Sequence, residues 1–112
     1  MEDLKELQSK IVKFRDDRNW EQFHNGKDLS LSLSLEVNEL LEVFQWSGDD
    51  LECAEKLDKI KEELADVFMY TFLLAEHYKL DIKDIILEKI RMNDLKYPVE
   101  KAKNKKDKYN DL

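Results

Sequence analysis

The chain has 112 residues, 40% of them charged, with a net charge of −7, two glycines and one proline. This length fits one domain, and this composition favours long helices and disfavours nonspecific binding to nucleic acid. The single cysteine, Cys53, excludes an internal disulfide and a thiolate metal cluster; with no signal-peptide pattern and no apolar run of membrane-spanning length, we expect a cytoplasmic protein.

The first helix is expected over residues 2–18, where apolar side chains recur on one face. These side chains are Leu4, Leu7, Ile11 and Phe14. A polar and aromatic segment follows, and it contains Asn25-Gly26, which is a turn signal. We therefore expect the second helix to begin after this turn, with Asp28 or Ser30 as its N-cap.

The second helix is expected to run to about Trp46 and to stop before Gly48. A third helix is expected over residues 51–78. Its second half, residues 67–75, is apolar nearly all round, and a helix of that kind has to be surrounded. The other three helices of so small a chain can scarcely cover this apolar half. The sequence therefore predicts that a second subunit covers part of it.

On a helical wheel, each of the two middle helices has a predicted core face. In the second helix this face comprises Leu33, Val37, Leu40, Leu41 and Phe44. In the third helix it comprises Ile60, Leu64, Val67, Thr71 and Leu74.

Asp81 is expected to cap a fourth helix that continues to about Lys96 and ends before Pro98. The predicted fold is therefore all-α, a four-helix bundle assembled as an oligomer, with its domain over residues 1–98. Residues 99–112 are expected to form a polar, Lys-rich tail. Two of its side chains could dock on a neighbouring subunit: Tyr109 and Leu112.

Two acidic motifs carry the strongest chemical signal. They are Glu36-Val-Asn-Glu39 and Glu63-Leu-Ala-Asp66, and in each the two carboxylates share one helix face. Both lie beside strongly apolar sequence, where unpaired carboxylates are costly. A divalent cation is the simplest compensation, and oxygen ligands suit Mg²⁺, Ca²⁺ or Mn²⁺. If the two helices pack antiparallel, the four carboxylates can converge on one cleft.

Two alternatives stay open at this point. The segment Glu39-LLEVF echoes Glu63-LADVF, so that Glu39 and Glu42 could instead pair with Glu63 and Asp66. This echo fits either a duplicated helix pair or chance in a chain rich in Glu and Leu. Solvated helix faces are the other alternative, because a chain with 26 acidic residues forms such patterns easily.

A polar, cationic stripe is expected on the fourth helix, where Lys89, Asn93 and Lys96 recur at helical spacing beside Tyr97. Such a stripe can bind phosphate oxygens. A solvated basic face near a helix C-terminus is the alternative.

Four aromatic side chains are candidates for a nucleobase pocket, because aromatic faces stack on bases. They are Trp20, Phe23, His24 and Trp46. Core packing is the alternative for the first two, and an ordinary loop position is the alternative for His24.

Together these segments resemble the all-α nucleoside triphosphate pyrophosphohydrolases of the MazG-like superfamily, and within it the dCTP pyrophosphatase branch. The resemblance runs from about Ile11 to the C-terminus. The order and spacing of five segments carry it: RDDRNWEQFH, LEVNELLEVFQW, EELADVFMY, KIRMNDLKYPV and KYNDL.

This resemblance implies a site for Mg²⁺, with Mn²⁺ as a substitute, and it selects Glu36 over Glu42. The implied ligands, which are also the catalytic residues, are Glu36, Glu39, Glu63 and Asp66. The implied substrate contacts are phosphate contacts from Lys89 and Asn93 with Tyr97 nearby, and nucleotide contacts from His24, Trp46 and Tyr70.

The implied reaction is hydrolysis of a deoxynucleoside triphosphate, most favourably dCTP, to the monophosphate and pyrophosphate. Either Glu39 or Glu63 is expected to accept the proton of the attacking water. A dimer or tetramer is expected, with no nucleic acid polymer and no membrane as partner.

One departure concerns the base. Related animal enzymes carry a longer loop with an added aromatic residue between the motif helices. In this chain the corresponding segment, residues 47–61, is short and contains no aromatic residue. Trp20 or a neighbouring subunit is therefore expected to enclose the base. The alternative functions are hydrolysis of dUTP or modified nucleotides, and a non-catalytic helical module that binds nucleotide or a partner helix.

Overall fold

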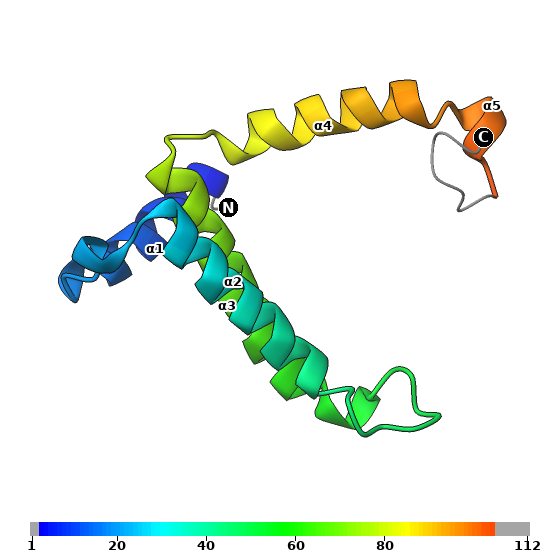
Figure 1. Ribbon diagram of the computed structural model, residues 1–112, viewed down its shortest axis with the longest axis horizontal. Coiled ribbons are helices and arrows are strands. Elements are labelled where there is room, and N and C mark those ends of the chain that lie inside the picture. Colours follow the sequence, from blue (N-terminus) through cyan, green and yellow to red (C-terminus); the bar gives the residue numbers. More distant parts are fainter. Residues whose placement is uncertain (1–2, 105–112) are drawn as a thin grey trace. The chain divides into compact units, whose positions relative to one another are not determined.

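The computed structural model describes residues 3–104, and every regular element in that range is a helix (Figure 1). The all-α class predicted from the sequence is therefore confirmed. The chain divides into two compact units, Met1–Lys79 and Leu80–Leu112, and each is described by itself. Within the described range, no helix is long and apolar enough to cross a bilayer.

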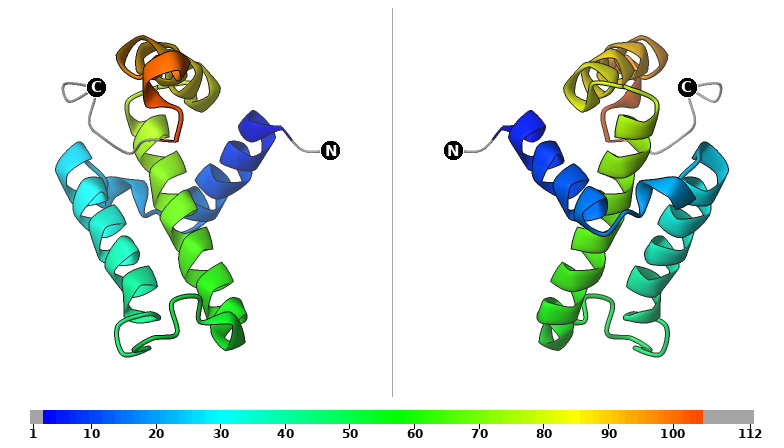
Figure 2. Two further views of the ribbon diagram at one scale, coloured as in Figure 1. Left: turned by 90° about the vertical axis from the view of Figure 1, so that its right-hand side faces the viewer. Right: turned by 90° about the vertical axis from the view of Figure 1, so that its left-hand side faces the viewer.

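The first unit contains three α-helices and two short 3₁₀ helices. They are α1 (Leu4–Asp17), η1 (Glu21–Phe23), α2 (Gly26–Glu42), η2 (Ala54–Lys56) and α3 (Leu57–His77). The helices α2 and α3 run antiparallel side by side, and α1 packs against α3 (Figure 2). The antiparallel arrangement is the one that lets the two acidic motifs meet.

The start of α2 differs from the prediction. The side chain of Asn25 accepts a hydrogen bond from the backbone N–H of Asp28 at 2.8 Å, so Asn25 is the N-cap. The expected turn at this position and the expected caps, Asp28 and Ser30, are therefore wrong. Gly26 is the first helical residue, and a Cβ there would lie 1.8 Å from the hydroxyl of Tyr78. A larger residue at position 26 would therefore force the Tyr78 side chain to move away from the start of α2.

The connection between α2 and α3 is also longer than predicted. The helix α2 ends at Glu42 rather than near residue 46, and α3 begins at Leu57 rather than near residue 51. Cys53 has a left-handed backbone, with φ of 47°, and this interrupts the helical path. The carbonyl of Val43, which follows the last residue of α2, accepts from Cys53 Sγ at 3.8 Å and from Lys56 Nζ at 3.4 Å. These side chains satisfy a carbonyl that the helix itself cannot.

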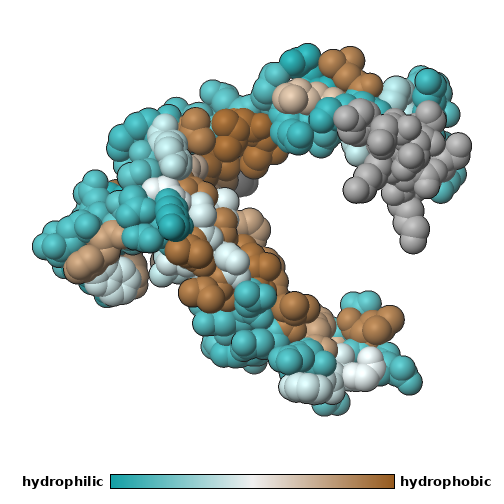
Figure 3. Space-filling view, viewed as in Figure 1, coloured by the Kyte–Doolittle hydropathy of each residue, from teal (hydrophilic) through white to brown (hydrophobic). Residues whose placement is uncertain are grey.

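The core of the first unit is small. Its buried apolar residues are Ile11, Leu29, Val43, Cys53, Phe72, Leu73 and Ala75. Several residues of the predicted core faces are exposed in the single chain, including Val37 (47%), Leu41 (61%) and Leu64 (41%). Apolar surface consequently lies along the α2–α3 pair (Figure 3).

The second unit contains α4 (Ile82–Lys96) and α5 (Val99–Ala102). The side chain of Asp81 accepts from the N–H of Asp84 at 3.0 Å, so the predicted cap of α4 is confirmed. The short α5 was not expected, because it lies in the predicted polar tail. Two tail residues named from the sequence lie outside the described residues: Tyr109 and Leu112.

Candidate metal and nucleotide site

Four carboxylates meet between α2 and α3. Glu36 and Glu39 extend from α2, and Glu63 and Asp66 from α3; one oxygen from each lies within 4.8 Å of the others. Glu42 is not part of this group. The geometry therefore selects the register that begins at Glu36 over the one suggested by the internal echo.

Two of these carboxylates carry oxygens that lack hydrogen-bond partners although they are buried. They are Oε2 of Glu36 and Oε2 of Glu63, and the Glu63 residue as a whole is only 6% exposed. A buried polar atom without a partner is costly unless a ligand satisfies it. These oxygens, in a group of oxygen-only donors, fit a hard divalent cation.

The electrostatics of Glu36 reflect this crowding. The pKa of Glu36 is raised to about 7, first by burial, then by its hydrogen bond with Glu39 and by the charges of Glu39, Asp66 and Glu63. A proton is therefore one way of relieving the repulsion among the four acids, and a cation is another.

Tyr70 lies close enough to this group to respond to it. Its pKa is raised by burial and then by the charges of Glu36 and Asp66, while a side-chain hydrogen bond with Ser32 on α2 acts in the opposite direction. The phenol is half-buried. Its position one turn after Asp66 places a neutral hydroxyl beside the carboxylates.

Two lysines border the carboxylates. Lys59 Nζ lies 2.9 Å from Oε1 of Glu63, and both residues line an open cleft of about 690 Å³ together with Lys56. The other lining residues are Glu39, Glu42 and Val43. The sequence interpretation missed Lys59, although its spacing of four residues before Glu63 is a recognisable signal for a helical ion pair.

The aromatic candidates do not form one pocket in a single chain. Trp20 and His24 precede α2, whereas Trp46 follows it and is 87% exposed. The 17 residues of α2 separate them by about 25 Å, at about 1.5 Å per residue. Phe23 is 64% exposed. A base that contacts one end of α2 in this chain cannot contact the other end.

His24 differs from an ordinary loop histidine. Its Nδ1 is buried and has no hydrogen-bond partner, and its pKa is lowered by burial and then by the positive charge of Arg15. The imidazole is therefore neutral at pH 7 and can still form a hydrogen bond at Nδ1.

The predicted phosphate contacts lie in the second unit. Lys89, Asn93 and Lys96 are exposed on α4, and Tyr97 is the half-buried residue that ends it. The backbone N–H of Tyr97 donates to the carbonyl of Asn93 at 2.8 Å. Their roles stay predictions.

Comparison with known proteins identifies the family. The model of the MazG-like family matches residues 31–112, which include all four carboxylates. The chain belongs to the MazG-like family. The resemblance predicted from the sequence is thereby confirmed, and with it, at the level of the family, the class of nucleotide pyrophosphohydrolases.

Individual proteins that are similar to this chain support the same family assignment. The chain is 34% identical over 117 aligned positions to dCTP pyrophosphatase 1 from Bos taurus, Mus musculus and Homo sapiens. The alignments cover 100% of this chain and 67–68% of those proteins. The crystal structure of a pyrophosphatase from Archaeoglobus fulgidus is 35% identical, with a TM-score of 0.79, and the match covers 88% of this chain and 94% of that one.

Proposed function

We propose that this MazG-like protein hydrolyses a deoxynucleoside triphosphate, most favourably dCTP, to the monophosphate and pyrophosphate. The convergence of four carboxylates within 4.8 Å, two of them with buried unpartnered oxygens, carries the proposal. The similarity to proteins named dCTP pyrophosphatase supports the choice of substrate.

Glu36, Glu39, Glu63 and Asp66 would hold Mg²⁺, or Mn²⁺ in its place. A metal held by these acids would offset their mutual repulsion, attract the substrate phosphates and lower the pKa of the attacking water. The neighbouring Lys59 forms an ion pair with Oε1 of Glu63. The buried Oε2 of Glu63 is therefore the oxygen left to bind a metal.

One of the acids would accept the proton of the attacking water. Glu39 is exposed and borders the cleft, so it reaches solvent water more readily than the buried Glu63. Glu63 already shares one oxygen with Lys59. These contacts favour Glu39 over Glu63 as the general base.

The substrate contacts complete the proposal. Lys89 and Asn93 would stabilise the charge on the departing pyrophosphate, with Lys96 and Tyr97 beside them. Tyr70 lies beside the carboxylates and would contact the nucleotide there. His24 and Trp20 would contact the nucleoside from before α2, and Trp46 would do so from after it.

Because the two aromatic ends of α2 are about 25 Å apart, one base would meet both only in an assembly. Apolar residues along the α2–α3 pair are exposed in the single chain and offer the surface for a second copy: Leu31, Leu35, Leu41, Leu64 and Phe68. We therefore include a dimer or tetramer in the proposal. The predicted cytoplasmic location belongs to it as well and can be checked by cell fractionation.

The decisive experiment is a phosphate assay coupled to inorganic pyrophosphatase, run over all four common dNTPs and dUTP, with and without Mg²⁺. We expect metal-dependent release of pyrophosphate with dCTP ranked first. A higher rate with dUTP, or with a modified nucleotide added to the panel, would support the alternative substrates. Nucleotide binding without any pyrophosphate release would support a non-catalytic module.

A further inference from the structure

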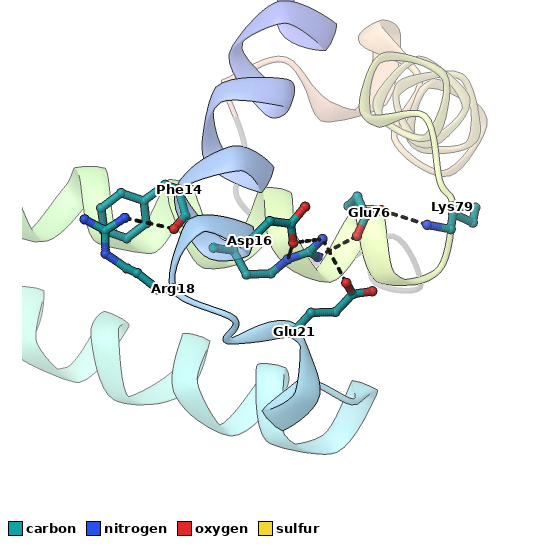
Figure 4. Close-up of polar contacts among 7 residues, drawn as sticks. Phe14, Asp16, Arg18, Glu21, Glu76 and Lys79 are labelled. Carbon is teal, nitrogen blue, oxygen red and sulfur yellow. Dashed lines mark hydrogen bonds and ion pairs between the residues drawn. The ribbon is translucent and has the colours of Figure 1, made fainter.

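Arg15 is a buried cation at the end of α1, only 4% exposed. A guanidinium removed from water needs opposite charges placed close to it. Glu76 lies 2.8 Å from Nη1, and Oδ1 of Asp16 lies 2.9 Å from both Nε and Nη2 (Figure 4). Glu21 adds a third carboxylate, 3.7 Å from Nη2. Three acids thus surround one guanidinium.

These acids belong to three different segments of the first unit. Asp16 is in α1, Glu21 is in η1, and Glu76 is near the end of α3. Glu76 is itself held by Lys79, whose Nζ lies 2.7 Å from Oε1. The side chain of Arg15 therefore connects the end of α1 and the segment before α2 to Glu76 on α3.

The backbone of Arg15 holds the same segment a second time. Its carbonyl accepts hydrogen bonds from the N–H groups of Arg18 at 3.2 Å and Trp20 at 3.1 Å. Between them Asn19 has a left-handed backbone, with φ of 54°, which reverses the chain. The ring of Trp20 then packs edge-on against Phe14, with centroids 5.8 Å apart. These backbone bonds persist whatever side chain stands at position 15; the Arg15 side chain acts on Trp20 through the adjacent Glu21.

The far end of the held segment is His24. Its backbone N–H donates to the carbonyl of Glu21 at 2.9 Å, so its position depends on η1, which Arg15 contacts through the Glu21 side chain. The buried Nδ1 of His24 has no protein partner. A neutral imidazole offers one donor and one acceptor, which is suitable for a hydrogen bond to a nucleoside.

Arg15 is too distant to act on the carboxylates. Its partner Glu76 follows Asp66 by ten positions on α3, about 15 Å at about 1.5 Å per residue. Loss of Arg15 should therefore misplace the segment before α2 and leave the metal ligands in place.

We propose that Arg15 is a positioning residue, which holds the segment carrying Trp20 and His24 where that segment binds the nucleoside part of the substrate. This rests on the proposed function. The expected signature is a defect in substrate binding without a defect in the chemical step, because misplaced contacts remote from the reacting atoms affect ground-state and transition-state binding alike.

The test compares Arg15→Met, Arg15→Lys and Arg91→Met in the full chain. For Arg15→Met we expect KM for the best dNTP to rise about tenfold or more with kcat within about twofold of wild type, because the lost contacts bind the ground state and the transition state equally. Arg15→Lys should show a smaller rise in KM than Arg15→Met, because lysine keeps the positive charge but lacks the several fixed N–H donors of the guanidinium. Arg91→Met is the matched control. It removes an exposed arginine that pairs with Glu88 on α4.

A spectroscopic measurement reports on the segment without substrate. In a Trp46→Phe background, Trp20 is the remaining tryptophan. Arg15→Met should shift its emission to longer wavelength and increase its quenching by acrylamide, while the helical circular dichroism stays unchanged.

Two outcomes would overturn the proposal: an unchanged KM in Arg15→Met, or a loss that falls on kcat alone. If Arg15→Met does not fold, Glu21→Gln decides, because Glu21 is exposed and its loss leaves the other two ion pairs intact. We expect a KM rise of about threefold there, weaker because the contact is longer and exposed, and an unchanged KM would refute the proposal. A wild-type protein that releases no pyrophosphate from any dNTP would instead refute the proposed function.

Discussion

Glu36 on α2 and Glu63 on α3 each keep one buried carboxylate oxygen, Oε2, without a hydrogen-bond partner. The two residues lie 27 positions apart in the sequence and belong to one group of four acids. Folding has therefore brought like charges together and buried two of their oxygens away from the protein surface. Such an arrangement destabilises the folded chain unless a proton or a cation compensates for it.

The first prediction concerns the acids as ligands. Glu36→Gln or Asp66→Asn should abolish turnover at saturating Mg²⁺, because each removes a charged ligand. Without metal, the unfolding temperature should stay equal or rise, because repulsion is relieved. Turnover assays and thermal unfolding in EDTA measure both effects. Glu42→Gln is the control and should be nearly silent, and near wild-type turnover in either ligand variant would show that the metal site is misassigned.

The second prediction concerns pH. The pKa of Glu36 is raised from 4.5 to about 7, so the folded state binds its proton more tightly than the unfolded state does. The stabilisation is full below about pH 4.5 and is lost as pH rises through about 7. In EDTA, the free energy of unfolding should thus fall between about pH 5 and pH 8, and Mg²⁺ should restore it at the upper end. Urea unfolding should show a flatter pH profile for Glu36→Gln; identical profiles would contradict the assigned pKa.

The third prediction concerns Glu76, whose pKa is shifted in the opposite direction. The hydrogen bond from Lys79, and then that from Arg15, hold it below its usual value of 4.5. The stabilisation is present above about pH 4.5 and disappears as pH falls through the lower, folded-state pKa. Glu76→Gln should therefore lose stability near neutral pH and differ progressively less from wild type as the pH falls below 4.5. Urea unfolding across the acid range checks this, with Glu62→Gln, an exposed acid on the same helix, as the control.

The fourth prediction concerns assembly. The exposed apolar side chains along the α2–α3 pair predict an obligate oligomer with a large hydrophobic interface. Size-exclusion chromatography with light scattering should show no folded species near 13.4 kDa at micromolar concentration. Phe68→Lys should weaken the assembly, whereas Leu4→Lys, at an exposed apolar position on α1, should leave it intact. A folded wild-type monomer would rule out the interface.

The fifth prediction separates the two ends of the substrate. Lys89→Ala should weaken binding and slow turnover for every base alike, because phosphates carry no base identity. Trp46→Ala should change the ranking among dCTP, dUTP and dTTP, because stacking reports on the base. Steady-state kinetics of both variants over the three substrates checks this. If Lys89→Ala changed the ranking and Trp46→Ala did not, the substrate would lie in the reverse orientation.

Local signals in the sequence predicted the four long helices but not all of their ends. Asp81 caps α4 as expected, and the motif spacing correctly placed two carboxylates on one face of each middle helix. Local signals failed at the start of α2, because Asn-Gly is typical of a turn and Asn is also a good helix N-cap. The packing of Tyr78 against Gly26 joins residues far apart in the sequence, so it could be seen only in the structure.

The pairing of Arg15 with Glu76 could not be predicted, because 61 positions separate them and neither lies in an unusual pattern. Part of the predicted core faces is exposed for a different reason. Helical periodicity identifies an apolar face but does not say whether the chain itself or another copy covers it, and Val37 and Leu41 are exposed in the single chain.

The close approach of Gly26 to Tyr78 has a consequence for how this chain can vary in length. The Tyr78 side chain lies against the start of α2, and Lys56 Nζ contacts the Val43 carbonyl just after its end. One residue inserted in α2 between Gly26 and Glu36 would rotate every later side chain by about 100° and turn the acids away from α3. Insertions in MazG-like relatives of this chain should therefore accumulate between residues 44 and 52, and the ten-residue step from Gly26 to Glu36 should keep its length.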